Sequence, residues 1–473
     1  MTRDNFLPRW VHGLLLVVAA LVAALVPSTL PALPVFAGNT MAALDTMMKI
    51  IYSEPLIRDI VTDSELLDLF EQDSNIQTDQ TTGGKWVEMA HYRRLAGAAG
   101  ARGENDYLPV PAQPAGFNTR IFLRKIIGVV EMTGDVMEKV VGDEGSFLNF
   151  MEQALPDTKE RVVKEVNRMT AGFGAGIKAR VASKPGGNVI TVDRSLGVTG
   201  FEDAWLQFSE GDRIVFSANP NGAPLRNAGT AQSALVETID ETTGALTLTV
   251  DAPTYTALQV NDFIFEGDQS GTSAQDGGVN REMQGLLAGV DDGNILAVYN
   301  NYNRSTNRIW RSRVFSAAGA PYDGVLTERL LTVCDAATQT AMASKINAIV
   351  TSVHAPIGYW DDLRGDRVIN DPRSYTGGKG ALSILLGDRT LPLRTARGLP
   401  PQVAFGLNTS TWRRFSLGTW EWQSRSGSIW TQVLDAVGRR DAYFAFGKMY
   451  EELACIRPRA NFRIDGLARQ FNY

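Results

Sequence analysis

The chain has few of the residues that carry chemistry in enzymes. Its 473 residues include two cysteines, Cys334 and Cys455, and three histidines. Two thiols on separate apolar stretches cannot build a disulfide framework or a zinc site, so we expect both to be buried thiols. No histidine has a partner at metal-binding spacing, and neither a phosphate-binding loop nor a nucleophile elbow is present. The sequence therefore predicts no catalytic residue, no metal site and no cofactor, and we expect the protein not to be an enzyme.

The chain also lacks a surplus of positive charge. It has 46 Lys and Arg against 52 Asp and Glu, a net charge of −6. Sequence-specific nucleic-acid binding is therefore disfavoured. The acidic pairs Asp361–Asp362 and Glu451–Glu452 have no catalytic partner nearby, and we interpret both as solvated faces. A hydrophobic content of 44% and a charged content of 21% are typical of a globular protein, and the length suffices for two to four domains.

The first 40 residues stand apart from the rest. Arg3 and Arg9 precede an apolar, almost uncharged run from Val11 to Val26. This pattern is typical of a signal peptide or a short membrane anchor. The alternative is a start site assigned too far upstream, because the chain could begin at any of three methionines: Met41, Met47 and Met48.

Residues 41 to 133 contain two segments that are too extended to be stable alone. Met41 to Phe70 has an amphipathic helical pattern with Pro55 as a break, and such an arm must pack on something. Lys85 to Arg93 and Asn118 to Val130 alternate as strands, and a long Gly-, Ala- and Pro-rich loop joins them. A two-stranded hairpin of this length has no core of its own, so we expect another molecule or domain to order it.

Gly145 to Gly174 predicts the longest helix after the leader, following a short one at Asp135 to Val141. Apolar residues recur every three or four positions, and Pro156 should kink or split the run. Glu165 can pair with Arg168 one turn on, so this side should face water or a polar neighbour. The apolar positions are Phe147, Met151, Ala154, Leu155, Val162, Val166, Met169 and Phe173.

The next segment, 182 to 278, is expected to be an all-β insertion of short strands separated by turns. The later chain alternates between predicted helix at Val325 to Ala343, a buried strand at Ile346 to His354 and an aromatic-rich stretch at Trp412 to Val433. The expected strands of the insertion are Asn188 to Asp193, Trp205 to Phe208, Arg213 to Ser217, Ser233 to Ile239, Leu246 to Val250 and Asp262 to Glu266.

This order of segments, from Met41 to Tyr473, resembles the major capsid proteins of tailed bacteriophages, whose Hong Kong 97-type fold is shared with encapsulins. The most similar passages are LTERLLTVCDAATQ at 326–339, INAIVTSVHA at 346–355 and ALSILLGDRTLPLRTARGLPPQVAFGLNTSTWRRF at 381–415. GSIWTQV at 427–433 and ELACIRPRANFRIDGL at 452–467 belong with them. The resemblance implies an α+β fold with an N-arm at 41–79, an E-loop hairpin at 80–133, a spine helix region at 134–181, a P domain at 279–353, an A domain at 354–433 and a C-terminal return to the P domain at 434–473. The leader at 1–40 and the β-rich insertion at 182–278 depart from the simplest members.

The resemblance also implies a function. Subunits of this family form the pentamers and hexamers of an icosahedral shell, which is assembled in the host cytoplasm and encloses double-stranded DNA without sequence specificity in the virion. Further partners would be scaffolding, portal or decoration proteins, with no small-molecule substrate. An encapsulin-like compartment, or an exported bacterial binding protein with a β module, are the alternatives. The expected inter-subunit contacts are Arg93, Arg94, Arg102, Glu104 and Asp106 at the hairpin tip, and Trp420, Trp422 and Trp430 near a capsomer or domain contact.

Overall fold

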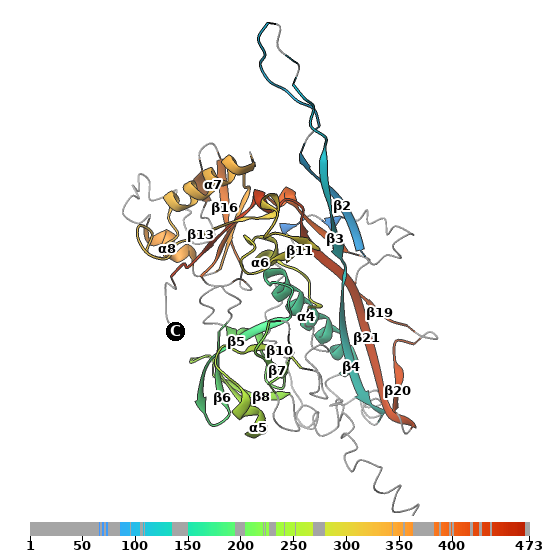
Figure 1. Cartoon of the computed structure of the whole chain (residues 1–473). Helices are drawn as coiled ribbons and strands as arrows, with labels where there is room; N and C mark the ends of the chain where they lie inside the picture. The colour runs from blue at the N-terminus through green and yellow to red at the C-terminus, as the bar shows by residue number, and fades with distance from the viewer. Residues whose placement is uncertain are drawn as a thin grey trace, which may run out of the picture. The chain divides into compact units, whose positions relative to one another are not determined.

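The computed structural model divides the chain into Met1–Ala37 and Gly38–Tyr473, and every residue it describes lies in the second unit (Figure 1). The expected leader, the short helix at 135–141 and His354 lie outside the described residues. The described residues are 66, 69–70, 72–73, 86–94, 96–104, 107, 109–134, 150–193, 204–220, 222, 224–226, 233–240, 242–250, 252–267, 280–342, 344–352, 355–362, 383–386, 389–396, 399, 402–416, 420–424, 428–435 and 438–468.

A six-stranded sheet is built around one long strand, β21 (Gly438–Cys455). β21 pairs antiparallel with β4 (Arg124–Thr133) from Ala442 to Glu451. Four strands follow in the order β1 (Gln72–Asp73), β18 (Trp412–Ser416), β21 and β19 (Glu421–Trp422). The strand β20 (Thr431–Asp435) also pairs with β21. Phe70, just before β1, is buried against Trp412 with ring centroids 5.4 Å apart, so this end of the expected arm packs into the core.

One face of β4 is covered by the helix α4 (Phe150–Ala171). Val162 and Val166 are buried in the main core, as the apolar spacing predicts. The expected split at Pro156 does not occur, because α4 runs through this residue without interruption. A proline inside a helix loses the hydrogen bond of its missing N–H and crowds the carbonyl four residues earlier, and the packing of the later turns, with Val162 and Val166 buried, offsets this cost.

A second six-stranded sheet lies later in the chain, in the order β13 (Arg313–Ser316), β22 (Phe462–Asp465), β17 (Ala404–Leu407), β14 (Ala348–Thr351), β16 (Arg389–Thr395), β15 (Ser383–Leu386). The helix α7 (Glu328–Met342) confirms the helix expected at Val325 to Ala343 and packs on this sheet through Leu330, Leu331 and Cys334. Cys455 is buried as well, so both thiols are buried as predicted. The remaining short elements are α6 (Leu286–Gly289), β11 (Val298–Tyr299), β12 (Tyr302–Asn303), η3 (Arg308–Trp310), α8 (Ala355–Asp362), η6 (Thr409–Thr411) and η7 (Pro458–Ala460).

The β-rich segment closes into a barrel with its own apolar core. Its strands are β5 (Ile177–Gly186), β6 (Val189–Asp193), β7 (Arg213–Ser217), β8 (Ala234–Asp240), β9 (Ala245–Thr249) and β10 (Phe263–Glu266), in the closed order β10-β5-β6-β9-β8-β7. The barrel starts at Ile177, before the expected boundary at 182. Every expected strand is present except Trp205 to Phe208. That prediction was wrong: η2 (Ala204–Gln207) is a 3₁₀ turn, in which the Phe208 N–H donates to the Trp205 carbonyl at 3.0 Å.

The barrel consists of two equivalent halves, β5-β6-η2-β7 and β8-β9-α5-β10, where α5 is Ala252–Ala257. Exchanging β5 with β8, β6 with β9 and β7 with β10 leaves the order of pairing unchanged. Gly211 and Asn261 occupy matching turns with φ of 89° and 74°, and each backbone N–H donates to a valine carbonyl of the other hairpin at 2.8 Å. The next residues, Asp212 and Asp262, each accept a backbone N–H from three residues earlier, at 2.9 and 2.8 Å.

The expected strand 118–130 is two strands. β3 (Ala115–Phe122) pairs only with β2 (Trp86–Arg94), whereas β4 pairs with β21. Buried positions are odd-numbered in β3 and even-numbered in β4, so the chain twists at Leu123 between them. Among the helices in the described part of the chain, none is long and apolar enough to cross a bilayer.

Candidate assembly surfaces

The β2–β3 hairpin has no third strand among the described residues. Beyond the β2–β3 ladder, Gly97 forms a bridge with Ala112, and the Arg94 Nε donates to the Gln113 carbonyl at 2.9 Å. Large apolar side chains are exposed here, with Tyr92 at 79%, Tyr107 at 96% and Val110 at 88%. An exposed Tyr and Val on a two-stranded ribbon are surfaces that a partner can cover.

The predicted contact residues of the tip are solvent-facing where they are described. The side chains of Arg93, Arg94, Arg102 and Glu104 are exposed, and Asp106 lies outside the described residues. Arg94 is already used within the hairpin. Their contact with another subunit stays a prediction.

The root of the hairpin, in contrast, is fixed to the body by aromatic packing. Phe117 stacks on Tyr302 with centroids 4.1 Å apart and on His91 at 5.0 Å. Trp310 closes the cluster edge-on, at 5.6 Å from Phe117 and 4.9 Å from His91. The Arg120 N–H also donates to the Asn300 carbonyl at 3.1 Å. The hairpin is therefore fixed to the body at its root, whereas Tyr107 and Val110 near its tip are exposed.

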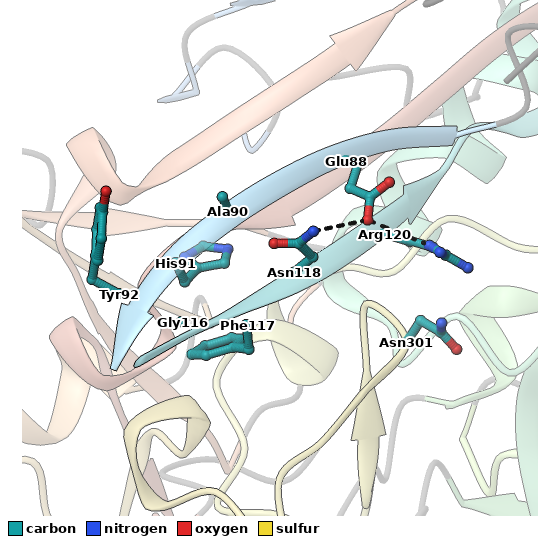
Figure 2. Close-up of a pocket in the computed structure, with 9 residues that line it drawn as sticks. All are labelled: Glu88, Ala90, His91, Tyr92, Gly116, Phe117, Asn118, Arg120 and Asn301. Carbon is teal, nitrogen blue, oxygen red and sulfur yellow. Dashed lines mark hydrogen bonds and ion pairs between the residues drawn. The ribbon is translucent and has the colours of Figure 1, made fainter. Parts of the chain in front are cut away.

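A groove of about 690 Å³ follows this root (Figure 2). Glu88 ties the two strands across it, accepting from the Asn118 side chain at 3.2 Å and lying 3.7 Å from the Arg120 guanidinium. His91 Nε2 and Thr119 Oγ1 are hydrogen-bonded at 2.9 Å. Burial, and then the charge of Arg457, lower the pKa of His91. His91 is thus a neutral ring in an aromatic cluster at neutral pH.

The tryptophans expected at a capsomer or domain contact pack first on their own chain. Trp420 lies over Gly128 of β4 and Gly447 of β21. Trp422 and Trp430 pack on Val130 and Met132, which are buried. Each indole is only partly buried, so a further contact with a neighbour stays a prediction.

A surface that the sequence did not predict lies on the outward face of β4 and β21. Ile127 is 47% and Val129 59% exposed, although both are large aliphatic residues in a strand that pairs with β21 over ten residues. Their partners across the ladder are Lys448 and Phe446. The signal was present in the sequence, because the run from Ile126 to Val130 is apolar at consecutive positions, where one-sided burial requires alternation.

The prediction that Glu451–Glu452 forms a solvated face was wrong. Both carboxylates are buried, because β21 lies between β18 and β4. Glu451 binds the Arg414 guanidinium, whereas Glu452 accepts the Gln284 N–H at 2.7 Å and lies 3.5 Å from Arg124 Nε. Burial raises the pKa of Glu452 well above its ordinary value. The side chains of Asp361–Asp362 are outside the described part.

No group of His, Cys, Asp and Glu in the described part of the chain is arranged to hold a metal ion. The buried acids instead meet arginines and backbone amides, as Glu451 and Glu452 do. These acids belong to the packing of the fold.

Comparison of the chain with known proteins identifies its fold. No protein-family model matches the chain, and no curated protein matches it. The cyanophage A-1(L) capsid asymmetric unit aligns with 91% of this chain and 99% of its own, at a TM-score of 0.51 and 11% identity. The capsid of Myoviridae phage XM1 covers 91% and 100% at a TM-score of 0.42 and 9% identity, and an encapsulin complex from Synechococcus elongatus PCC 7942 covers 92% and 98% at 0.38 and 8%. The chain has the fold of phage capsid proteins of the Hong Kong 97 type.

Proposed function

We propose that the chain is the major capsid protein of a tailed phage or prophage, forming the pentamers and hexamers of an icosahedral shell around double-stranded DNA. In this reading, 41–79 is the N-arm, the β2–β3–β4 region (80–133) the E-loop, 134–181, with α4, the spine helix region, 279–353 with 434–473 the P domain, and 354–433 the A domain. The barrel region (182–278) is an insertion. Scaffolding, portal or decoration proteins would be further partners, and the virion its location.

One observation carries the proposal: the hairpin has a fixed root and an uncovered tip. The aromatic cluster around Phe117 holds the root. The tip exposes Tyr107 and Val110, and no third strand pairs with the β2–β3 hairpin among the described residues. A two-stranded ribbon is at best marginally stable in water, so sister subunits that cover it would stabilise it. A closed symmetric shell supplies such a neighbour to every copy.

The outward face of β4 offers a second surface for assembly. Ile127 and Val129 form an exposed aliphatic pair beside Phe446, with Lys448 at its edge. An apolar centre with a polar border is the usual anatomy of a protein interface. We assign this face and the hairpin tip to contacts between subunits, and Arg93, Arg102 and Glu104 to the polar border of the tip.

The test is assembly of the chain expressed from Met41. Sedimentation velocity and negative-stain electron microscopy should show capsomers or closed shells. The double variant Tyr107→Ser/Val110→Ser should keep the wild-type unfolding temperature and lose the shells, because it alters only exposed side chains. Val260→Ser, on an exposed barrel turn, is the matched control and should assemble normally.

A compact monomer at high protein concentration would contradict the proposal. Mass spectrometry of purified particles separates it from the encapsulin alternative, which requires a cargo protein in place of a genome. An extracytoplasmic protein with a mature N-terminus near Gly38 would favour the exported binding protein.

A further inference from the structure

Four arginines lie on neighbouring elements near the hairpin root: the charges of Arg308 and Arg313 act on Arg459, and that of Arg457 acts on His91. Arg308 is in η3 and Arg313 in β13, whereas Arg457 and Arg459 flank the start of η7. η3 and η7 are in contact, and the Ser312 hydroxyl donates to the Pro458 carbonyl at 2.7 Å. We call these four residues the arginine cluster.

Among the residues that the structure describes, no carboxylate pairs with the arginine cluster. None of the four guanidiniums has an ion pair or hydrogen bond with the residues that the structure describes. The buried Arg463 differs from them, because it binds the Asp465 carboxylate at 2.8 Å.

The electrostatics of the cluster are those of crowded like charges. Burial, followed by the charges of Arg308 and Arg313, lowers the pKa of the Arg459 guanidinium. Arg457 acts in the same way on His91 at the hairpin root. The repulsion between these like charges is unfavourable in the free subunit. A bound anion would turn the electrostatic interaction at this site from unfavourable to favourable.

The chemistry of the cluster selects the anion. Guanidinium groups pair with phosphate through two parallel hydrogen bonds. A nucleic-acid backbone carries a charge at each nucleotide and can meet four arginines at once, whereas a single acidic side chain can meet one or two. In a chain with a net charge of −6 the cluster is a local exception.

We propose that Arg308, Arg313, Arg457 and Arg459 form a phosphate-binding surface for the double-stranded DNA that the shell encloses. The proposal rests on the proposed function and adds to it a defined site of backbone contact. Such a site binds without reading sequence, because phosphates carry none. It would hold the DNA at discrete points, in a chain whose net charge of −6 disfavours general adhesion to phosphate.

The test measures binding of the full chain, below the concentration at which particles form, to a short fluorescent duplex of mixed sequence by anisotropy. We expect salt-dependent binding between about 50 and 200 mM salt. Arg308→Gln/Arg459→Gln should weaken affinity about a hundredfold at the low-salt end and reduce the salt slope by about two. Lys125→Gln/Lys159→Gln removes the same charge from exposed positions elsewhere and should bind like the wild type.

The phosphate-binding surface would be overturned if the wild type did not bind at low salt, or if the arginine variant bound equally well. A polyglutamate peptide that competes as well as the duplex would indicate an acidic protein partner and also overturn it. So would loss of particle formation in the arginine variant with unchanged DNA affinity, because the partner would then be a second copy. If the wild type forms no particles but its DNA binding depends on the arginine cluster, the shell proposal is wrong and the phosphate-binding surface is still supported.

Discussion

Arg168 is buried on α4, and its guanidinium is shared by two carboxylates. It lies 2.9 Å from Glu165 and also binds Glu282. Glu165 is in turn 3.5 Å from Lys178 of β5, which is buried as well. The pairing of Glu165 with Arg168 follows from their spacing on a helix, and it is confirmed. The contacts with Glu282 and Lys178 come from distant segments, so the helical pattern alone could not predict them.

This cluster predicts a pH dependence of stability. Burial alone would raise the pKa of Glu165, but the charges of Lys178 and Arg168 outweigh it and lower the pKa to about 2, from an ordinary value of 4.5. Because the folded-state pKa is the lower one, ionised Glu165 stabilises the fold above pH 4.5, and this is lost as the pH falls toward 2. The difference in unfolding temperature between the wild type and Glu165→Gln should therefore narrow across this window.

Glu210→Gln is the control for that experiment, because Glu210 is an exposed carboxylate without such a cluster. The difference in unfolding temperature between Glu210→Gln and the wild type should stay constant as the pH falls from 4.5 toward 2. A constant difference for Glu165→Gln would show that Glu165 gains nothing from Lys178 and Arg168.

Gly447 predicts a second effect of a single residue. A Cβ atom at this position would lie 2.1 Å from Trp420 Cζ2, so the indole would have to move. Overpacking of this kind costs about 1–3 kcal/mol. We expect Gly447→Ala to lower the unfolding temperature and shift the tryptophan fluorescence. Gly100→Ala in the hairpin loop, where no atom lies within 4 Å, should do neither.

At the scale of elements, the hairpin root makes a prediction about dynamics. Phe117→Ala removes the ring between Tyr302 and His91 and should lower the free energy of local opening by about 1–3 kcal/mol. Amide hydrogen exchange in β2 and β3 should accelerate, while β4, held by β21, should stay protected.

Tyr92→Ala alters an exposed ring on the same ribbon and should leave exchange in the free subunit unchanged. Equal exchange in Phe117→Ala and the wild type would mean that the aromatic cluster does not anchor the hairpin. Acceleration of β4 as well would mean that the two strand pairs open together.

Helices and strands with a clear hydrophobic period in their own sequence were predictable. Element boundaries that depend on pairing with segments distant in the sequence were not. α4, α7 and most barrel strands carry their own apolar repeat. The break at Leu123 depends on β3 and β4 having different partners, which no local pattern contains. The two equivalent barrel halves share only scattered residues, such as Asp212 and Asp262, so the repeat becomes visible through its hydrogen bonds.

At the scale of the whole molecule, the outward face of β4 predicts a variant that folds but does not assemble. Val129→Asp places a charge in the centre of the exposed aliphatic pair, where desolvating it in an interface is unfavourable. Sedimentation should show a loss of particles with little change in unfolding temperature. Val333→Asp, on the exposed side of α7, is the control and should form particles. Normal assembly of Val129→Asp would remove this face from the contacts between subunits.

The sequence predicted what kind of surface the candidate site is, but not which residues pack together to form it. The stretched hairpin from Lys85 onward indicated a surface that needs a partner, and the uncovered tip agrees with that expectation. The tryptophans could be recognised as packing residues, but not assigned to Gly128 and Gly447. The arginine cluster joins residues about 150 positions apart (from Arg308 to Arg459), and only the contact between η3 and η7 reveals it.

The first and last strands of the barrel are hydrogen-bonded neighbours, with Ile177 opposite Phe265. The polypeptide thus enters and leaves the barrel at adjacent positions, and the rest of the chain needs only one attachment site for it. A module of this kind can be gained, lost or exchanged as a cassette while the host subunit keeps its geometry. The same position, where the chain enters and leaves the barrel, is where another domain could replace it with the least disturbance of the other two sheets.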